Sequence, residues 1–355
     1  MKKRVYFKNL NGIRAIAAFM VVINHLELLK FNNKIESFFI LNGIANFGSL
    51  GVTIFFVLSG FLITSLVCIE KENTQKISVR KFYMRRVLRI WPLFFLILIL
   101  GYSYAVYFDS YSISTLKTSA LYSVFFLTNV AMVLKLLPDV ILPIWSIGVE
   151  EQFYLVWPWL IKKINFNKLI YAMLALLFLF LFLKFASIVF HFTFLRDILF
   201  WTRFDCLITG GIIAVIKFSD FKLKKLLVNK IAQNINLILL LIYTALALTT
   251  NITVIHTVYG GFVGILLLGL TEEKKVIPIN LENKVLNYLG NISYGIYLYN
   301  FFVVNIIFSF LSIRIGNIIL FNVLYYVSCI IIIILLSSVS YYLYEKPFLR
   351  IKDKY

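Results

Sequence analysis

A histidine, two adjacent carboxylates and several arginines lie inside apolar stretches of this 355-residue sequence. Charged groups are costly in an apolar medium, so these residues are candidates for binding or catalysis. His25 follows Arg14 by eleven positions, which on a helix places both on one face, roughly 16 Å apart. An imidazole and a guanidinium so placed can move a proton and hold an anion. A snorkelling arginine and a hydrogen-bonded core histidine are the structural alternative.

A basic and aromatic segment that ends at Pro92 contains a second pair of candidates. Arg86 and Arg89 are separated by about one helical turn, so two planar guanidinium groups can grip one phosphate. Anchoring to anionic lipid is the alternative and is sufficient for the lysines upstream. Because the proline favours a helix that enters the membrane there, we predict phosphate binding at the arginine pair.

The carboxylates Glu150 and Glu151 lie in the segment from Trp145 to Pro158. Ser146, Glu150 and Tyr154 recur every four residues and therefore line one helix face. Two acids at hydrocarbon depth are hard to explain by packing, because without partners they would be neutral or excluded from lipid. We therefore count this face as part of a site.

Arg203 and Asp205 open a later apolar stretch and are further site candidates. Gly210 and Gly211 follow them and permit close approach of a second helix. A purely structural interpretation is also open, in which Arg203 or Lys184 forms an ion pair with one of the glutamates and holds helices together.

Membrane spans are the elements that must position these residues. Hydrophobic residues form 61% of the chain and charged residues 14%, and the mean hydropathy is +0.90, a balance that water-soluble domains do not reach. We predict an all-α integral membrane protein forming one domain over residues 1–355. A span needs about 20 apolar residues. Ten are predicted, near residues 11–29, 46–67, 91–108, 144–161, 168–190, 201–217, 231–249, 252–270, 286–310 and 315–343.

The distribution of positive charge predicts the orientation. With ten spans and a cytoplasmic N-terminus, 26 of the 35 lysines and arginines fall on the inner side, 6 outside and 3 within spans. Counting residues 116–134 as another span would put the five-lysine loop 217–230 outside, so we predict a re-entrant or interfacial segment there. We expect a plasma-membrane protein with both termini in the cytoplasm. Orientation explains the net charge of +19 without a nucleic-acid partner.

Cysteine and histidine spacing predicts neither disulfides nor a metal site. Cys68, Cys206 and Cys329 match no paired or ligand spacing, and the three histidines are far apart. No gap between predicted spans exceeds about 35 residues. The chemistry must therefore use residues within the bilayer or at its faces.

Seven segments, in this order along the chain, resemble the acyltransferase-3 family of integral membrane O-acyltransferases. They are the Arg14 to His25 spacing, Phe55 to Ile63, Arg85 to Pro92, Trp145 to Tyr154, Arg203 to Asp205 with the following glycines, Ile292 to Leu298, and Tyr344 to Phe348.

The resemblance implies a ten-helix domain that takes an acyl group, commonly acetyl, from cytoplasmic acyl-CoA and transfers it to a hydroxyl of a cell-surface carbohydrate. It implies catalysis by His25 and donor handling by Arg14, Arg86 and Arg89. Many members carry a histidine where this chain has Asn300. Longer members carry a fused SGNH-type domain, and we expect that second step to be absent here or performed by another protein.

We therefore expect an acyl-CoA-dependent O-acyltransferase without a tightly bound cofactor. Its partners are acyl-CoA, a glycan or other hydroxyl acceptor, and membrane lipid. His25 is the expected base for the acceptor hydroxyl, and Glu150 either orients it or balances the charge of Arg203. The alternative is a transporter or flippase for a lipid-linked sugar or an anion, although no inverted repeat is visible. Acyl transfer by the purified protein separates the two.

Overall fold

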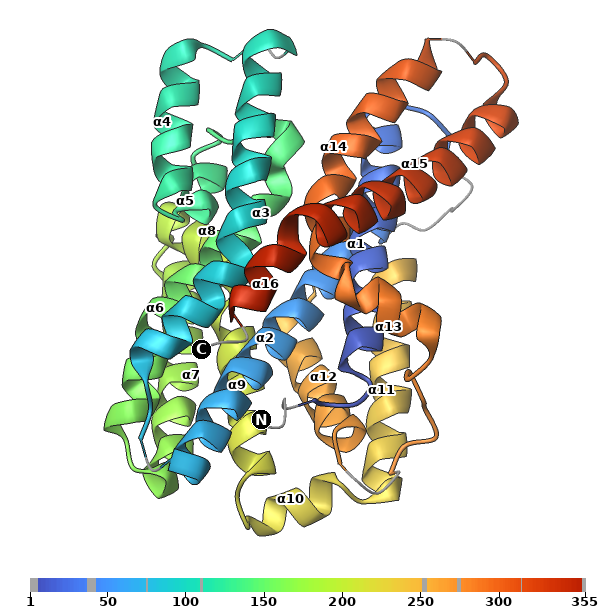
Figure 1. Cartoon of the computed structure of the whole chain (residues 1–355). Helices are drawn as coiled ribbons and strands as arrows, with labels where there is room; N and C mark the ends of the chain where they lie inside the picture. The colour runs from blue at the N-terminus through green and yellow to red at the C-terminus, as the bar shows by residue number, and fades with distance from the viewer. Residues whose placement is uncertain are drawn as a thin grey trace.

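The computed structural model describes residues 6–36, 43–74, 76–108, 111–250, 254–272, 276–313 and 315–352, and the regular elements in these ranges are helices (Figure 1). Eight helical segments there are long and apolar enough to cross a membrane, and the chain is an all-α, multi-pass membrane protein. The segments are α1 (Leu10–Asn32), α2 (Ile44–Thr74), α3 (Val79–Phe108), α7 (Phe166–Val189), α8 with α9 (Thr193–Lys217), α11 (Lys230–Thr249), α14 (Ser293–Ser312) and the segment Ile318–Lys352.

The other two predicted spans are present as helices of a different kind. The stretch 144–161 corresponds to α6 (Trp145–Lys163), which contains two carboxylates and ends in two lysines. The stretch 252–270 corresponds to the 15-residue α12 (His256–Leu270). Both helices lie in the interior of the bundle, where neighbouring helices rather than lipid surround much of their surface. Low hydropathy or short length is tolerated in such positions.

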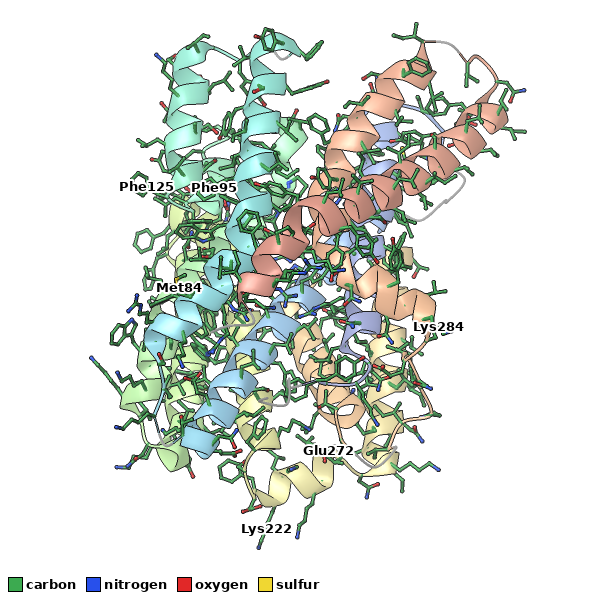
Figure 2. All side chains as sticks on the ribbon, in the orientation of Figure 1. Met84, Phe95, Phe125, Lys222, Glu272 and Lys284 are labelled. Carbon is green, nitrogen blue, oxygen red and sulfur yellow. The ribbon has the colours of Figure 1, made fainter. Side chains whose placement is uncertain are left out.

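Several segments whose lysines the sequence analysis places on the cytoplasmic side lie near the lower end of the molecule in Figure 1. The short helix α10 (Lys222–Leu227) lies there, and Figure 2 shows Lys222 projecting from it. The Lys71 ammonium donates to the carbonyl of Ile164, so the end of α2 meets the end of α6 at the same side. Lys217 binds Thr271 O at 2.8 Å and pairs with Glu272. Several basic segments thus share one face of the molecule.

Helices α2 and α9 cross with their backbones in contact. A Cβ atom at Gly60 would lie 1.9 Å from the carbonyl oxygen of Leu207, and one at Gly210 would lie 2.0 Å from that of Val57. No side chain fits at either glycine. Gly211 in turn faces the ring of Trp157 on α6. The predicted close approach at the glycine pair is confirmed, and it places α9 in the centre of the bundle.

The third helix begins earlier than predicted. It starts at Val79 instead of near residue 91, so Pro92 is inside α3 and not at its entry. A hydropathy window locates the bilayer core, whereas the first turns of this helix carry arginines and lysines. Proline removes one backbone donor and loosens the helix locally. Hydroxyl groups approach at this point: Tyr294 donates to Ile90 O at 2.9 Å and Tyr344 to Pro92 O at 3.2 Å.

The stretch 116–134 is broken, as predicted. It forms α4 (Ile113–Val124) and α5 (Thr128–Val133), neither of which reaches the length of a span. The chain turns between them at Phe126, whose φ is 58°. Tyr102 of α3 exchanges hydrogen bonds of 2.8 Å with Ser119 and Ser123 of α4, so this segment packs back along α3.

Three predicted spans are interrupted. α8 (Thr193–Thr202) and α9 (Phe204–Lys217) meet at Arg203, which has a left-handed backbone. α13 (Lys284–Asn291) is separated from α14 by Ile292. α15 (Ile318–Ser340) continues through a π-helical turn, Tyr341–Glu345, into α16 (Lys346–Lys352). The 3-10 turn η1 (Asp139–Ile144) leads into α6.

Candidate functional site

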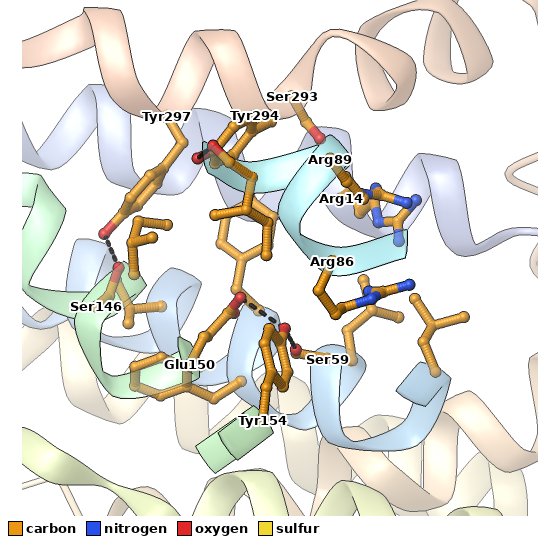
Figure 3. Close-up of a pocket in the computed structure, with 17 residues that line it drawn as sticks. Arg14, Ser59, Arg86, Arg89, Ser146, Glu150, Tyr154, Ser293, Tyr294 and Tyr297 are labelled. Atoms are coloured by element: carbon orange, nitrogen blue, oxygen red, sulfur yellow. Dashed lines mark hydrogen bonds between the residues drawn. The ribbon is translucent and has the colours of Figure 1, made fainter. Parts of the chain in front are cut away.

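A cavity of about 100 Å³ lies where α1, α2, α3, α6 and α14 converge. Its walls are partly apolar, with Phe55 and Ile90 among them, and its polar groups come from all five helices. Figure 3 shows the labelled polar side chains turned toward this common space. Six of the predicted site residues line it: Arg14, Arg86, Arg89, Ser146, Glu150 and Tyr154.

Three arginines form one side of this cavity, and we call the whole cavity the arginine pocket. Arg14 comes from α1, and Arg86 and Arg89 come from α3 (Figure 3). Within the described residues, none of the three guanidinium groups hydrogen bonds to protein, and the buried Nε of Arg86 is without a partner. Arg86 lies 5.9 Å from the ring centroid of Tyr154, a cation–π arrangement. Three positive charges and one carboxylate line the pocket, a balance that favours binding of an anion.

The predicted face of α6 lies along the opposite wall. Ser146 Oγ and the Tyr297 hydroxyl are 2.7 Å apart, and Tyr154 donates to Glu150 at 2.8 Å. The Tyr154 hydroxyl also hydrogen bonds to Ser59 of α2. Within the described residues, Glu150 therefore bonds to Tyr154 and to neither His25 nor Arg203, so both expected contacts of Glu150 are wrong. The carboxylate instead stands in the arginine pocket.

The two residues after Glu150 point to other helices. Glu151 accepts a hydrogen bond of 3.1 Å from the indole of Trp91 on α3. Gln152 donates to Phe126 O and to Asn129 Oδ1 at α5. Successive residues turn by about 100° on a helix, so these three side chains contact three different neighbours. Only Glu150 faces the cavity, which separates its role from that of Glu151.

His25 lies on α1 beyond the arginine pocket and does not line it. Its Nδ1 hydrogen bonds to the Oδ1 atom of Asn300, and its ring meets that of Phe301 edge-on at 4.7 Å. The side chain is half-buried. Eleven residues of helix separate it from Arg14, a rise of roughly 16 Å. The histidine and the arginines are thus two ends of one arrangement along α1.

Arg203 and Asp205 are outside the arginine pocket and belong to a separate charge cluster. Arg203 is 2% exposed and donates to Ser49 O and Ser49 Oγ, both at 3.1 Å. Its guanidinium is also stacked against three aromatic rings, including Trp145 at 5.4 Å. Asp205 pairs with Lys184 at 2.9 Å. The proposed ion pair of a glutamate with Arg203 or Lys184 is therefore absent from the described residues: Lys184 pairs with Asp205, and Arg203 bonds to neutral groups of Ser49.

Sequence reasoning missed four residues of the cavity. Tyr294 and Tyr297 project from α14 one turn apart, and Ser293 and Ser59 complete the lining. All four lie in segments that carried the family resemblance, although none was assigned a role. The spacing of the two tyrosines is the signal that could have found them, because residues three apart share a helix face.

The arrangement can hold a polyanion at one end and transfer a proton at the other. Planar guanidinium groups bind phosphate oxygens through paired hydrogen bonds. The imidazole of His25 has a ring nitrogen that can accept a proton. The apolar part of the cavity wall can take an uncharged arm.

Comparison with known proteins gives a consistent result. Residues 7–342 match the model of a family described as an acyltransferase domain. No solved structure matches the chain.

Three curated relatives show how far the similarity extends. The chain is 31% identical over 163 residues to the peptidoglycan O-acetyltransferase OatA of Listeria monocytogenes, covering 44% of this chain and 24% of that protein. It is 34% identical over 161 residues to YrhL of Bacillus subtilis, named "Putative peptidoglycan O-acetyltransferase", with 43% and 23% covered. It is 28% identical over 339 residues to a Staphylococcus aureus protein named "Putative O-acetyltransferase", with 87% and 52% covered. The chain thus matches about half or less of each relative's length.

Proposed function

The chain belongs to this acyltransferase family, and from that premise we propose that it is a membrane O-acetyltransferase that uses acyl-CoA as donor and a cell-surface glycan as acceptor. The family match and the names of the relatives support acyl transfer to oxygen. Acyl-CoA as the donor and a glycan as the acceptor are our inference from the chemistry of the site.

One observation carries the donor assignment: Arg14, Arg86 and Arg89 converge on one cavity without a hydrogen bond to any described residue. Acyl-CoA carries several phosphates at one end and a thioester at the other end of a long, uncharged pantetheine arm. We place the phosphates among the three guanidinium groups. The arm then extends along α1, so that the thioester comes near His25, roughly 16 Å further on.

The chemical step needs one base. The acceptor hydroxyl loses its proton to the free ring nitrogen of His25 as its oxygen attacks the thioester carbonyl. The new bond joins the sugar oxygen to the acyl carbon, the carbon–sulfur bond breaks, and the departing thiolate takes the proton from the imidazole. No cofactor enters this sequence.

Glu150 has a role at the donor end. Its carboxylate lines the same cavity on the wall opposite the three arginines, and the Tyr154 hydroxyl donates to it at 2.8 Å. When the donor is absent, the carboxylate partly balances the charge of the three arginines. The pocket stays net positive but binds the phosphates less tightly than three arginines alone would, so coenzyme A can leave after transfer. This assignment replaces the expected contact with His25.

The relatives' names suggest peptidoglycan as one acceptor. We propose that the protein is in the plasma membrane with both termini in the cytoplasm, because the basic loops then face inward. The arginine pocket would be reached by cytoplasmic acyl-CoA, and the acceptor would approach His25 from the outer side.

The test is acyl transfer by the purified protein in nanodiscs, supplied with acetyl-CoA labelled in the acetyl group and muropeptides or cell-wall glycan as acceptor. We expect release of the free thiol and label on sugar oxygens, detected by mass spectrometry. Arg196→Ala is a matched control, because Arg196 is an exposed arginine paired with Asp197 on α8. Release of thiol with no labelled sugar from any glycan would contradict the acceptor class, and neither product would favour a transporter.

Topology can be tested separately. A cysteine in place of Lys222 on α10 should not react with a membrane-impermeant maleimide added to intact cells. A cysteine at Ile313, which is 83% exposed at the end of α14, should react. The three native cysteines are buried and give little background. A cysteine in place of Lys354 should likewise not react from outside; this residue lies outside the described residues. Labelling of position 222 from outside would overturn the orientation.

A further inference from the structure

Asn300 on α14 is in contact with His25. Asn300 is fully buried. Its Nδ2 group donates to Ile296 O at 3.1 Å and to Tyr297 O at 2.5 Å. Both amide hydrogens therefore point to backbone carbonyls, and the amide cannot flip without losing both bonds. This leaves the carbonyl oxygen Oδ1 directed at Nδ1 of His25.

The direction of that amide fixes the state of the histidine ring. A carbonyl oxygen can only accept, so Nδ1 of His25 must carry the hydrogen. A neutral imidazole has one N–H, and its lone pair is therefore on Nε2. No described residue hydrogen bonds to Nε2, and the half-buried side chain keeps part of its surface accessible.

We propose that Asn300 is a positioning residue that holds His25 in the tautomer with hydrogen on Nδ1 and leaves Nε2 free as the base. The proposal rests on the proposed function, because it assigns which nitrogen takes the acceptor's proton. Phe301, the next residue, meets the same ring edge-on at 4.7 Å. Two neighbours on α14 therefore set both the hydrogen position and the orientation of the ring.

A second histidine shows what an imidazole with both ring nitrogens occupied looks like. His256 is 7% exposed, with Nδ1 2.9 Å from the Thr53 hydroxyl and Nε2 3.3 Å from that of Ser49. The Thr53 hydroxyl donates to Ser49 O and therefore accepts from Nδ1 of His256, and the Ser49 hydroxyl accepts from Arg203 and can donate to Nε2. Unlike in His25, the second nitrogen is not free. The contrast assigns a packing role to His256 and a reactive nitrogen to His25.

The test uses two variants of Asn300 and one matched control on the same helix. Asn300→Leu removes the acceptor oxygen, whereas Asn300→Asp keeps an oxygen for Nδ1. Asn305→Leu is the control, because Asn305 also donates to a carbonyl one turn back, Phe301 O at 2.7 Å. Protein labelled with ¹⁵N at histidine gives separate NMR signals for protonated and unprotonated ring nitrogens. The signals missing from His25→Gln identify those of His25.

We expect hydrogen on Nδ1 of His25 in the wild type and in Asn300→Asp, and a mixture of both tautomers in Asn300→Leu. Turnover of Asn300→Leu should fall by about tenfold or more, but by no more than the 10² to 10⁴ that a general base contributes, while KM for acetyl-CoA stays within about twofold. Asn300→Asp should retain more turnover than Asn300→Leu, and Asn305→Leu should behave as wild type.

Several results would overturn the proposal. A wild-type spectrum with hydrogen on Nε2 does so whatever the activity. Equal losses in Asn300→Leu and Asn305→Leu, or a loss confined to KM, would assign Asn300 to packing. The spectrum does not depend on turnover, so a wild type that shows the Nδ1 hydrogen but transfers no acyl group would sink the proposed function and leave the tautomer assignment supported.

Discussion

Two arginine environments in this molecule differ in how far the protein itself binds the guanidinium groups. Arg203 has neutral hydrogen-bond acceptors and aromatic rings around its guanidinium, and the neighbouring Asp205 is paired with Lys184. The arginine pocket holds Arg14, Arg86 and Arg89 without a hydrogen bond to a described residue. Arg203 keeps a buried Nε without a hydrogen-bond partner among the described residues, but the protein uses both of its terminal nitrogens. In the arginine pocket the described residues leave three guanidinium groups without hydrogen bonds, an arrangement that favours binding of an anion.

The difference separates structural charge from functional charge. A charged group that is buried and satisfied by its neighbours adds to the fold, whereas unsatisfied groups of one sign, held close together, cost free energy unless a ligand binds. His25 falls on the functional side, because Nε2 is free, and His256 falls on the structural side. Substitutions at four positions test this division.

The largest effect is expected at the histidine. His25→Gln keeps hydrogen-bonding capacity but cannot take up a proton, so turnover should fall by at least about 10²-fold, as expected for loss of a general base. Donor binding should persist, because the arginine pocket is roughly 16 Å away along α1. Steady-state kinetics and equilibrium binding of acetyl-CoA measure the two quantities. Turnover within a few-fold of wild type would end the catalytic assignment and direct attention to Glu150.

The next effect is expected in the arginine pocket. A charge-assisted hydrogen bond is worth roughly 1.5 to 3 kcal/mol, so Arg89→Ala should raise the apparent KM for acyl-CoA by about tenfold or more. Arg89→Lys should rescue poorly, since a lysine lacks the planar fork. Donor affinity equal to wild type in Arg89→Lys would mean that Arg86 and Arg89 only anchor α3 in the membrane.

A smaller effect on activity is expected from the completed environment. Arg203→Met retains much of the apolar stem but removes two hydrogen bonds to Ser49. The loss should lower the unfolding free energy by about 1 to 3 kcal/mol and the Tm by several degrees. Turnover per folded molecule should stay within about threefold. Thermal denaturation in detergent and kinetics at a temperature below the transition give both values; a large rise in KM for acyl-CoA would place Arg203 in the donor site after all.

The smallest effect is expected at the surface. Arg196 and Asp197 form an exposed pair, with side chains 51% and 47% exposed. Such pairs contribute little, so Arg196→Ala should change stability by less than about 0.5 kcal/mol and leave KM unaltered. A rise in KM for acyl-CoA as large as that of Arg89→Ala would show that loss of any positive charge weakens donor binding. The convergence of three arginines on one cavity would then not explain donor binding.

Much of the site could be predicted from local spacing. Ser146, Glu150 and Tyr154 share a face because four residues make about one turn, and the structure places all three at the cavity. The partner of Ser146 could not be predicted, because Tyr297 is 151 positions away and spacing within a helix says nothing about which helix lies opposite.

The errors in the fold have physical causes. Hydropathy reports the bilayer core, so it missed the basic first turns of α3 and placed Pro92 at a helix start. Hydropathy also did not predict the break between α8 and α9 at Arg203. The break depends on a left-handed backbone at Arg203, and an arginine rarely adopts that conformation, so its presence in the sequence does not indicate a break. The expected contacts of Glu150 failed for another reason: adjacent acids on a helix face different neighbours, and spacing within α6 does not say which helix lies beside each face.

The glycine crossing of α2 and α9 also constrains how the chain is made. Gly60 and Gly210 are 150 residues apart, so at about 5 to 20 residues per second the ribosome completes the second roughly 8 to 30 s after the first. During this interval α2 lies in the membrane with an open seam where α9 will later dock. We expect nascent chains stalled before residue 204 to expose a cysteine placed at Val57 to lipid-soluble maleimide, and chains stalled well beyond residue 217 to protect it. Protection already present in the shorter chains would mean that another element fills the seam until α9 arrives.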